Sequence, residues 1–221
     1  MTRPLVTSSA LAFTAGYVDT VGFIMLFGLF TAHVTGNFVL IGSELVHLDH
    51  GVTIKFLAFP AFVAGVAASR LLALAVERRD RPVVRPLLVL QIVLLAAYML
   101  CGWRAQPIVD ADAPWVLLTG MLGAAAMGVQ NASARLAFGD LSPTTVMTGN
   151  VTQLVLGLVD LLRGAADAGL RDRLQKLFWP VVTFGCGAIC GALISQRVSL
   201  WALALPLVIL CGLALASPAR R

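Results

Sequence analysis

Residues 29–37 read Leu-Phe-Thr-Ala-His-Val-Thr-Gly-Asn, and residues 141–150 read Leu-Ser-Pro-Thr-Thr-Val-Met-Thr-Gly-Asn. Each stretch ends in Thr-Gly-Asn and lies within a long apolar region. Glycine permits a helix break or a close approach, while Thr and Asn side chains can cap the free N–H groups of a new helix. Pro143 suits the first turn of such a helix. We therefore expect Thr35-Gly36-Asn37 and Thr148-Gly149-Asn150 each to start a half-helix after a break.

The composition indicates that the chain lies in a lipid bilayer. Of its 221 residues, 59% are apolar and only 12% are charged, whereas roughly a quarter are charged in ordinary soluble domains. The chain has too few polar residues to cover a soluble globule. We expect one all-α polytopic membrane domain over residues 1–221, with the lipid bilayer as its first partner.

The formal net charge of +5 does not point to nucleic acid, because the basic residues are scattered between apolar segments and only Lys55 and Lys176 are lysines. The four cysteines lie in apolar runs, where a thiol behaves as a small apolar side chain. We therefore expect neither a disulfide nor a metal site, and no cofactor.

The charged loops predict the topology. Eight apolar segments treated as eight simple crossings place either Arg3 or the arginine-rich loop 77–85 on the wrong side of the membrane. The conflict disappears if residues 5–47 and 114–162 each make one net crossing and contain a broken or re-entrant segment. The chain then crosses about six times, in two three-crossing halves, 5–103 and 114–216. Both termini, loop 77–85 and residues 171–176 are expected inside, and residues 47–50, 106–114 and Arg197 outside.

The two halves share a sequence pattern. Gly16-Tyr17-Val18-Asp19 precedes the first triplet as Gly128-Val129-Gln130-Asn131 precedes the second. Downstream, Phe59-Pro60 with Gly65 matches Trp179-Pro180 with Gly185. Because each half has an odd number of crossings, this similarity predicts an inverted repeat, which is typical of many secondary transporters.

Several polar residues in the apolar runs are candidates for a substrate or ion site. Asp19 lies near the middle of a long apolar segment, where an ionisable group is costly and usually functional. It could exchange a proton or hold a cation, or it could only join helices; its counterpart Asn131 cannot titrate. His33 and Gln130 are further candidates, although His33 could also be a simple interfacial residue. Two half-helix N-termini that face one another would favour an anionic or polar solute, whereas a dry packing seam at the triplets would not.

At these residues the sequence resembles the YoaK family of bacterial integral membrane proteins, a group defined by a domain of unknown function. The resemblance rests on Gly16-Tyr17-Val18-Asp19 and the two Thr-Gly-Asn triplets, and it covers nearly the whole chain. It implies about six membrane spans in the inner membrane, in agreement with the charge-based count. It implies no activity or substrate.

The sequence therefore favours a small secondary transporter or channel in the bacterial inner membrane, which moves a small polar or anionic solute with possible proton or cation coupling through Asp19. The alternative is a membrane scaffold or sensor partner that transports nothing. A membrane enzyme is disfavoured, because no nucleophile, base and orienting acid occur together. Residues 185–192 offer a face of small side chains, which could pack within one chain or form the contact of a homodimer.

Overall fold

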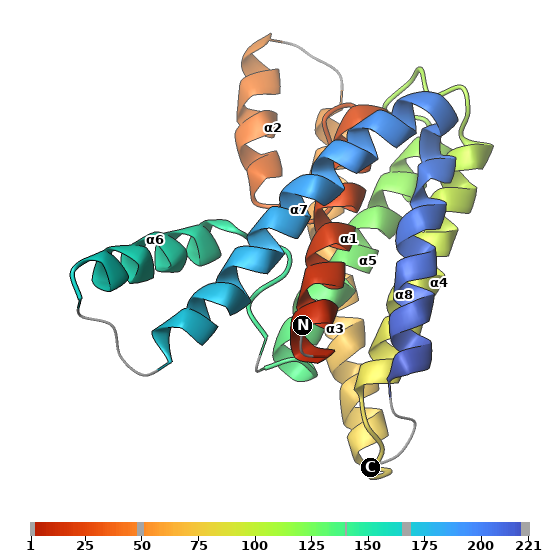
Figure 1. Ribbon diagram of the computed structural model, residues 1–221. Coiled ribbons are helices and arrows are strands. Elements are labelled where there is room, and N and C mark those ends of the chain that lie inside the picture. The colour runs from red at the N-terminus through yellow and green to blue at the C-terminus, as the bar shows by residue number, and fades with distance from the viewer. Residues whose placement is uncertain (1–2, 48–50, 140, 165–168, 218–221) are drawn as a thin grey trace.

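The computed structural model describes residues 3–47, 51–139, 141–164 and 169–217. Residues 48–50 and the last four residues, for which the sequence predicts a side of the membrane, lie outside this part. The described residues form helices and no strands (Figure 1). The helices are α1 (Arg3–Met25), α2 (Gly36–His47), α3 (Val52–Glu77), α4 (Val84–Arg104), α5 (Pro114–Leu136), α6 (Thr148–Leu162), α7 (Leu170–Val198), the short 3₁₀-helix η1 (Ser199–Leu203) and α8 (Ala204–Ala216).

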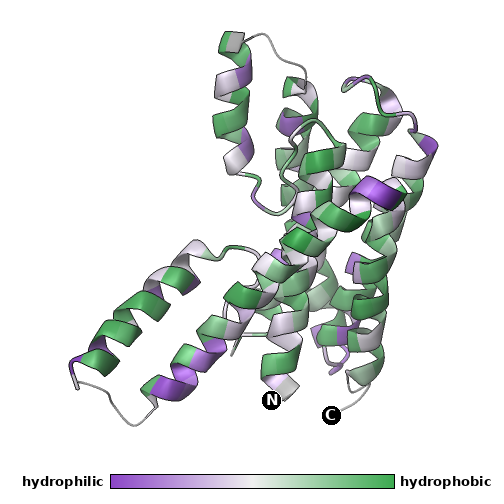
Figure 2. Ribbon diagram, turned by 45° about the horizontal axis from the view of Figure 1, so that its top comes forward, coloured by the Kyte–Doolittle hydropathy of each residue, from purple (hydrophilic) through white to green (hydrophobic). Residues whose placement is uncertain are grey.

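Three helical segments in the described part are long and apolar enough to cross a membrane: α3, α4 and the run from Leu170 to Ala216 that contains α7, η1 and α8. Figure 2 shows apolar residues along most of the length of these helices. Their outward side chains are apolar as well, including Leu71, Val93 and Leu193. An outer surface of this kind is stable in lipid and not in water, so the expected all-α membrane protein is confirmed.

α1 and α5 lie inside the bundle and carry buried polar side chains. Each has 23 residues, or about 34 Å of helix at 1.5 Å per residue. Thr14 and Asp19 of α1 and Thr119 and Gln130 of α5 are all buried. Because neighbouring helices shield α1 and α5 from lipid, polar side chains can be accommodated there.

α2 and α6 are short and project away from the bundle (Figure 1). They have 12 and 15 residues, too few to span a hydrocarbon core of about 30 Å. α2 begins at Gly36 and α6 at Thr148, so the prediction that each triplet starts a helix is confirmed. Pro143 lies five residues before α6 and not in its first turn, which corrects the expected role of this proline.

α1 and α7 pack backbone against backbone. A Cβ atom on Gly16 would overlap the carbonyl oxygen of Phe184, and a Cβ atom on Gly187 would overlap that of Phe13. The two helices can therefore approach this closely only because both positions are glycine, as is common where membrane helices contact one another.

α3 and α5 make the corresponding contact. A Cβ atom on Gly65 would overlap the carbonyl oxygen of Ala125, and one on Gly128 would overlap that of Phe62. The sequence pattern pairs Gly65 with Gly185, but a Cβ atom on Gly185 would meet nothing within 4 Å. Gly187 makes the close contact instead, because two residues turn about 200° around a helix and place Gly185 on the opposite side.

These contacts predict different effects for two glycines on the same helix. Gly187→Ala forces α1 and α7 apart and should destabilise the protein by about 1–3 kcal/mol, as overpacking does in other tightly packed sites. Gly185→Ala is the matched control, and it should be neutral or stabilising by up to about 1 kcal/mol through helix propensity. Thermal unfolding in detergent measures both variants, and equal effects at the two positions would contradict the packing described.

Candidate functional site

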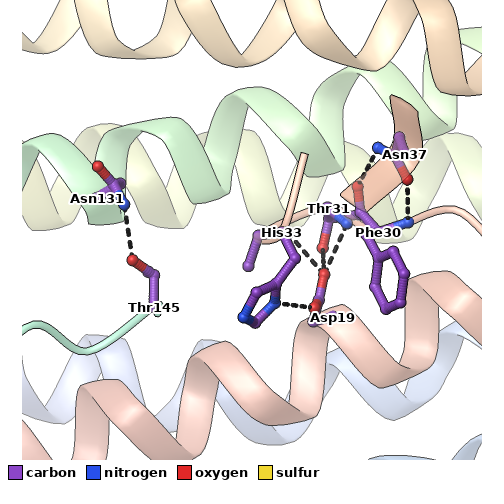
Figure 3. A network of polar contacts seen from close by, with 8 residues as sticks. Asp19, Phe30, Thr31, His33, Asn37, Asn131 and Thr145 are labelled. Atoms are coloured by element: carbon purple, nitrogen blue, oxygen red, sulfur yellow. Dashed lines mark hydrogen bonds and ion pairs between the residues drawn. The ribbon is translucent and has the colours of Figure 1, made fainter. Parts of the chain in front are cut away.

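The chain breaks between α1 and α2 and returns to the last two turns of α1, where Asp19 holds it (Figure 3). Asp19 Oδ1 accepts hydrogen bonds from the backbone N–H groups of Thr31 and Ala32, each at 2.7 Å, and from the Thr31 hydroxyl at 3.3 Å. The Asp19 residue is only 5% exposed. Its carboxylate satisfies buried N–H groups that the broken backbone would otherwise leave without partners.

His33 completes the coordination of this carboxylate. Its Nδ1 lies 2.6 Å from Asp19 Oδ2, so the ring donates through Nδ1–H and Nε2 is left for another partner. The side chain is 33% exposed, and its ring stands edge-on to Phe30 and Phe184. Asp19 and His33 therefore form an acid–base pair with one buried member and one partly accessible member.

Asn37 holds the same break from the other side. Its Oδ1 accepts a hydrogen bond from the Phe30 N–H at 2.9 Å, and its Nδ2 donates to the Phe30 carbonyl at 2.8 Å. The side chain thus pairs with both backbone groups of one loop residue (Figure 3). The expectation that Asn caps the helix that it starts is wrong, because the amide reaches back across seven residues into the loop.

The second half contains a similar arrangement between α5 and α6. Asn150 Nδ2 donates to the Pro143 carbonyl at 2.8 Å, again across seven residues. Proline has no N–H, so the amide oxygen of Asn150 has no donor at this residue. Asn131, the counterpart of Asp19, donates through Nδ2 to Thr145 Oγ1 at 2.7 Å (Figure 3). The second break is therefore held by neutral groups.

Gln130 joins three parts of the buried interior. Its Nε2 donates to the Leu11 carbonyl at 2.8 Å and to Thr144 Oγ1 at 3.3 Å, while its Oε1 accepts from Gln91 Nε2 at 2.7 Å. Gln91 Oε1 is buried with no hydrogen-bond partner among the described residues. The role of Gln91 on α4 is not predicted by the sequence pattern.

The remaining triplet residues do not point into the protein. Thr35, Thr148 and Gly149 are exposed, and a Cβ atom on Gly149 would meet nothing within 4 Å. Gly36 is closer to a neighbour, since a Cβ atom there would lie 3.3 Å from the ring of Phe30. Of the two triplets, therefore, the asparagines make the interior contacts.

An ion pair that the sequence pattern does not predict joins α2 to α3 beside the first break. Lys55 is fully buried in α3, and its Nζ donates to the Phe27 carbonyl and to Glu44 Oε1 of α2. Phe27 has φ 52° and Gly28 has φ 75°; for Phe27 this left-handed backbone is strained. The signal in the sequence is a single lysine at the start of an apolar segment, which does not by itself identify its partner.

A second unpredicted residue is Tyr98 of α4. It is completely buried, and its hydroxyl has no hydrogen-bond partner among the described residues. A Cβ atom on Gly22, three residues after Asp19, would lie 3.4 Å from this hydroxyl. The Tyr98 hydroxyl is therefore a hydrogen-bond donor without a partner among the described residues, and it lies near the Asp19 carboxylate.

Two pockets lie away from these polar residues. One, of about 310 Å³, is at the turn between α3 and α4, and the other, of about 360 Å³, is between α6 and α7. Neither is lined by Asp19 or by a residue of either triplet. Asp19, Asn37 and Asn150 are themselves buried.

The buried position of Lys55 predicts a large coupling with Glu44. Lys55→Met or Glu44→Gln leaves the other charge buried and unpaired, which costs about 3–5 kcal/mol. The double variant removes both charges, so its cost should be well below the sum of the two single costs. Denaturant unfolding in detergent gives the double-mutant cycle.

Arg70 and Glu77 provide the control pair, because they lie 3.9 Å apart with side chains 53% and 48% exposed. Removing either should cost less than about 1 kcal/mol. Additive costs for Lys55 and Glu44, or costs as small as those of the control pair, would show that the ion pair does not hold α2.

Comparisons with known proteins place the chain in a family. Residues 7–216 match the model of a family described as "Protein of unknown function (DUF1275)". The chain is also 27% identical over 210 residues to the "UPF0700 transmembrane protein YoaK" of Bacillus subtilis (strain 168), a match that covers 93% of this chain and 90% of that protein. No solved structure matches. The resemblance drawn from the sequence motifs is confirmed, and the chain belongs to the DUF1275 family of membrane proteins, with YoaK among its relatives.

Proposed function

We propose that this protein is a small secondary transporter or channel of the bacterial inner membrane, which moves a small polar or anionic solute and is coupled to protons at Asp19 and His33. The observation that carries the proposal is the buried carboxylate at a helix break, paired with a partly exposed histidine at 2.6 Å. Ionisable groups in such positions mark ion pathways and proton relays in membrane proteins.

The contacts within and between the halves support an inverted repeat of two three-crossing units. α1 packs on α7 through Gly16 and Gly187, and α5 packs on α3 through Gly128 and Gly65. The first long helix of each unit thus packs against a helix of the other unit. Asparagine-to-loop bonds across seven residues occur in both units. Broken segments in corresponding places are typical of transporters with inverted repeats.

The donors around Asp19 favour a proton over a metal cation as the coupling ion. Each contact to the carboxylate that the described residues make comes from an N–H, an O–H or the His33 ring. Hard cations bind to several oxygen ligands, which this arrangement lacks. A proton, in contrast, can bind at His33 Nε2 and leave an imidazolium beside the carboxylate.

The second candidate function is a membrane scaffold or sensor partner without transport. The observation that favours it is the position of the two pockets, neither of which is lined by Asp19 or by the triplets. Under this alternative the polar contacts serve only to hold the breaks. The two candidates differ in whether the Asp19 charge matters once the fold is kept.

The proposed topology has six crossings with both termini and the α3–α4 turn inside. In a variant without its native cysteines, cysteine at Arg78 should react with a membrane-impermeant thiol reagent only from the cytoplasmic side. Cysteine at Val109, which is 79% exposed between α4 and α5, should react only from the outside. Labelling of both positions from one side would eliminate the six-crossing arrangement.

Asp19→Asn separates the coupling role from the structural role. Asparagine keeps an oxygen for the N–H groups of Thr31 and Ala32, and its amide can donate to His33 Nδ1 in the other tautomer. Folding should therefore survive, with a melting temperature within a few degrees of wild type. Proton-gradient-driven uptake into proteoliposomes, assayed with a panel of small inorganic anions and carboxylates, should fall at least tenfold.

Asp112→Asn is the matched control, since it removes one carboxylate from an exposed loop and should leave uptake unchanged. Full gradient-driven uptake by a folded Asp19→Asn protein would reject the coupling role. Absence of uptake by the wild-type protein for the whole panel would favour the scaffold or sensor alternative.

A further inference from the structure

The pocket at the turn between α3 and α4 has a strongly basic lining. Its charged residues are Arg79, Arg81 and Arg85. In the described part of the chain none of the three belongs to an ion pair; the nearby pair, Arg70 with Glu77, uses a different arginine. The pocket therefore presents three guanidinium groups without a protein counter-charge.

The remaining lining of this pocket is apolar, and it continues into the membrane. Its apolar residues are Val76, Pro82, Pro86 and Val89. From Val89 an outward stripe follows α4 through Val93 and Leu100, which are 46%, 58% and 51% exposed respectively. Spacings of four and eleven residues place all three on one face of the helix. Because α4 is long and apolar enough to cross a membrane, this face meets lipid acyl chains.

We propose that this pocket binds the phosphodiester headgroup of an anionic phospholipid, with one acyl chain lying along Val89, Val93 and Leu100. Arginine pairs with phosphate oxygens through two parallel N–H bonds, and basic clusters at the ends of membrane helices attract anionic lipids. A soluble phosphate could use the arginines but would gain nothing from the apolar stripe. The combination of both features identifies the ligand as a lipid.

The acidic residues nearby do not cancel this charge. Glu77 and Asp80 occur in the same turn but do not line the pocket. Glu77 faces Arg70 at 3.9 Å. Residues 77–85 contain four arginines and these two acids, so the turn keeps an excess of positive charge.

Native mass spectrometry of the full-length protein tests the proposal. The protein is titrated in detergent with phosphatidylglycerol, with phosphatidylcholine and with soluble glycerol phosphate, and the detergent is removed in the mass spectrometer. Wild type should bind one phosphatidylglycerol in preference to phosphatidylcholine. The triple variant Arg79→Gln, Arg81→Gln, Arg85→Gln should lose this binding by roughly fivefold for each arginine removed.

The matched control is Arg104→Gln, Arg163→Gln, Arg197→Gln, which removes three exposed arginines elsewhere and should bind phosphatidylglycerol as wild type does. If the triple variant does not fold, Arg81→Gln alone is measured and should bind about fivefold more weakly. Equal binding by the pocket variant and the control variant would overturn the proposal. So would equal affinity for phosphatidylcholine, or for soluble glycerol phosphate, because the site would then not select an anionic lipid.

Discussion

The structure depends on one requirement, which is that a backbone broken within a buried interior must find its hydrogen-bond partners inside the protein. At the first break the Asp19 carboxylate provides them, because it accepts the N–H groups of Thr31 and Ala32 at 2.7 Å. Asn37 pairs with Phe30 on the same loop. With these groups satisfied by side chains, the chain can reverse after α1 and begin α2 without leaving buried backbone groups unpaired.

The close backbone contacts between helices explain why the polar residues can be placed at the centre. Gly16 with Gly187 and Gly65 with Gly128 bring α7 onto α1 and α3 onto α5. α1 and α5 are thereby covered by neighbouring helices, and their polar side chains, Asp19 and Gln130 among them, are buried. The functional candidates thus lie where a membrane protein can tolerate polar groups.

The membrane class, the helix starts at the two triplets and the buried position of Asp19 could be predicted from the sequence, because they depend on composition and on local backbone chemistry. The contacts of Asn37 and Asn150 could not, since a bond across seven residues depends on how the loop folds back. The pairing of Lys55 with Glu44 requires the docking of α2 on α3. The sequence pattern also selects Gly185, whereas the structure uses Gly187. Only the position of the facing helix determines which of the two residues must be a glycine.

Asp19 links the first break to the proposed proton coupling, and the most direct test of this link is a solid-state NMR measurement in bilayers. Dipolar recoupling between the ¹³C-labelled Asp carboxyl and the ¹⁵N-labelled backbone amides, with Asp19→Asn as the reference for assignment, reports whether the carboxylate contacts Thr31 and Ala32. We expect strong dephasing at both amides and an Nδ1-protonated His33 ring beside the carboxylate. Dephasing at neither amide would contradict this role, because Asp19 would then not hold the break.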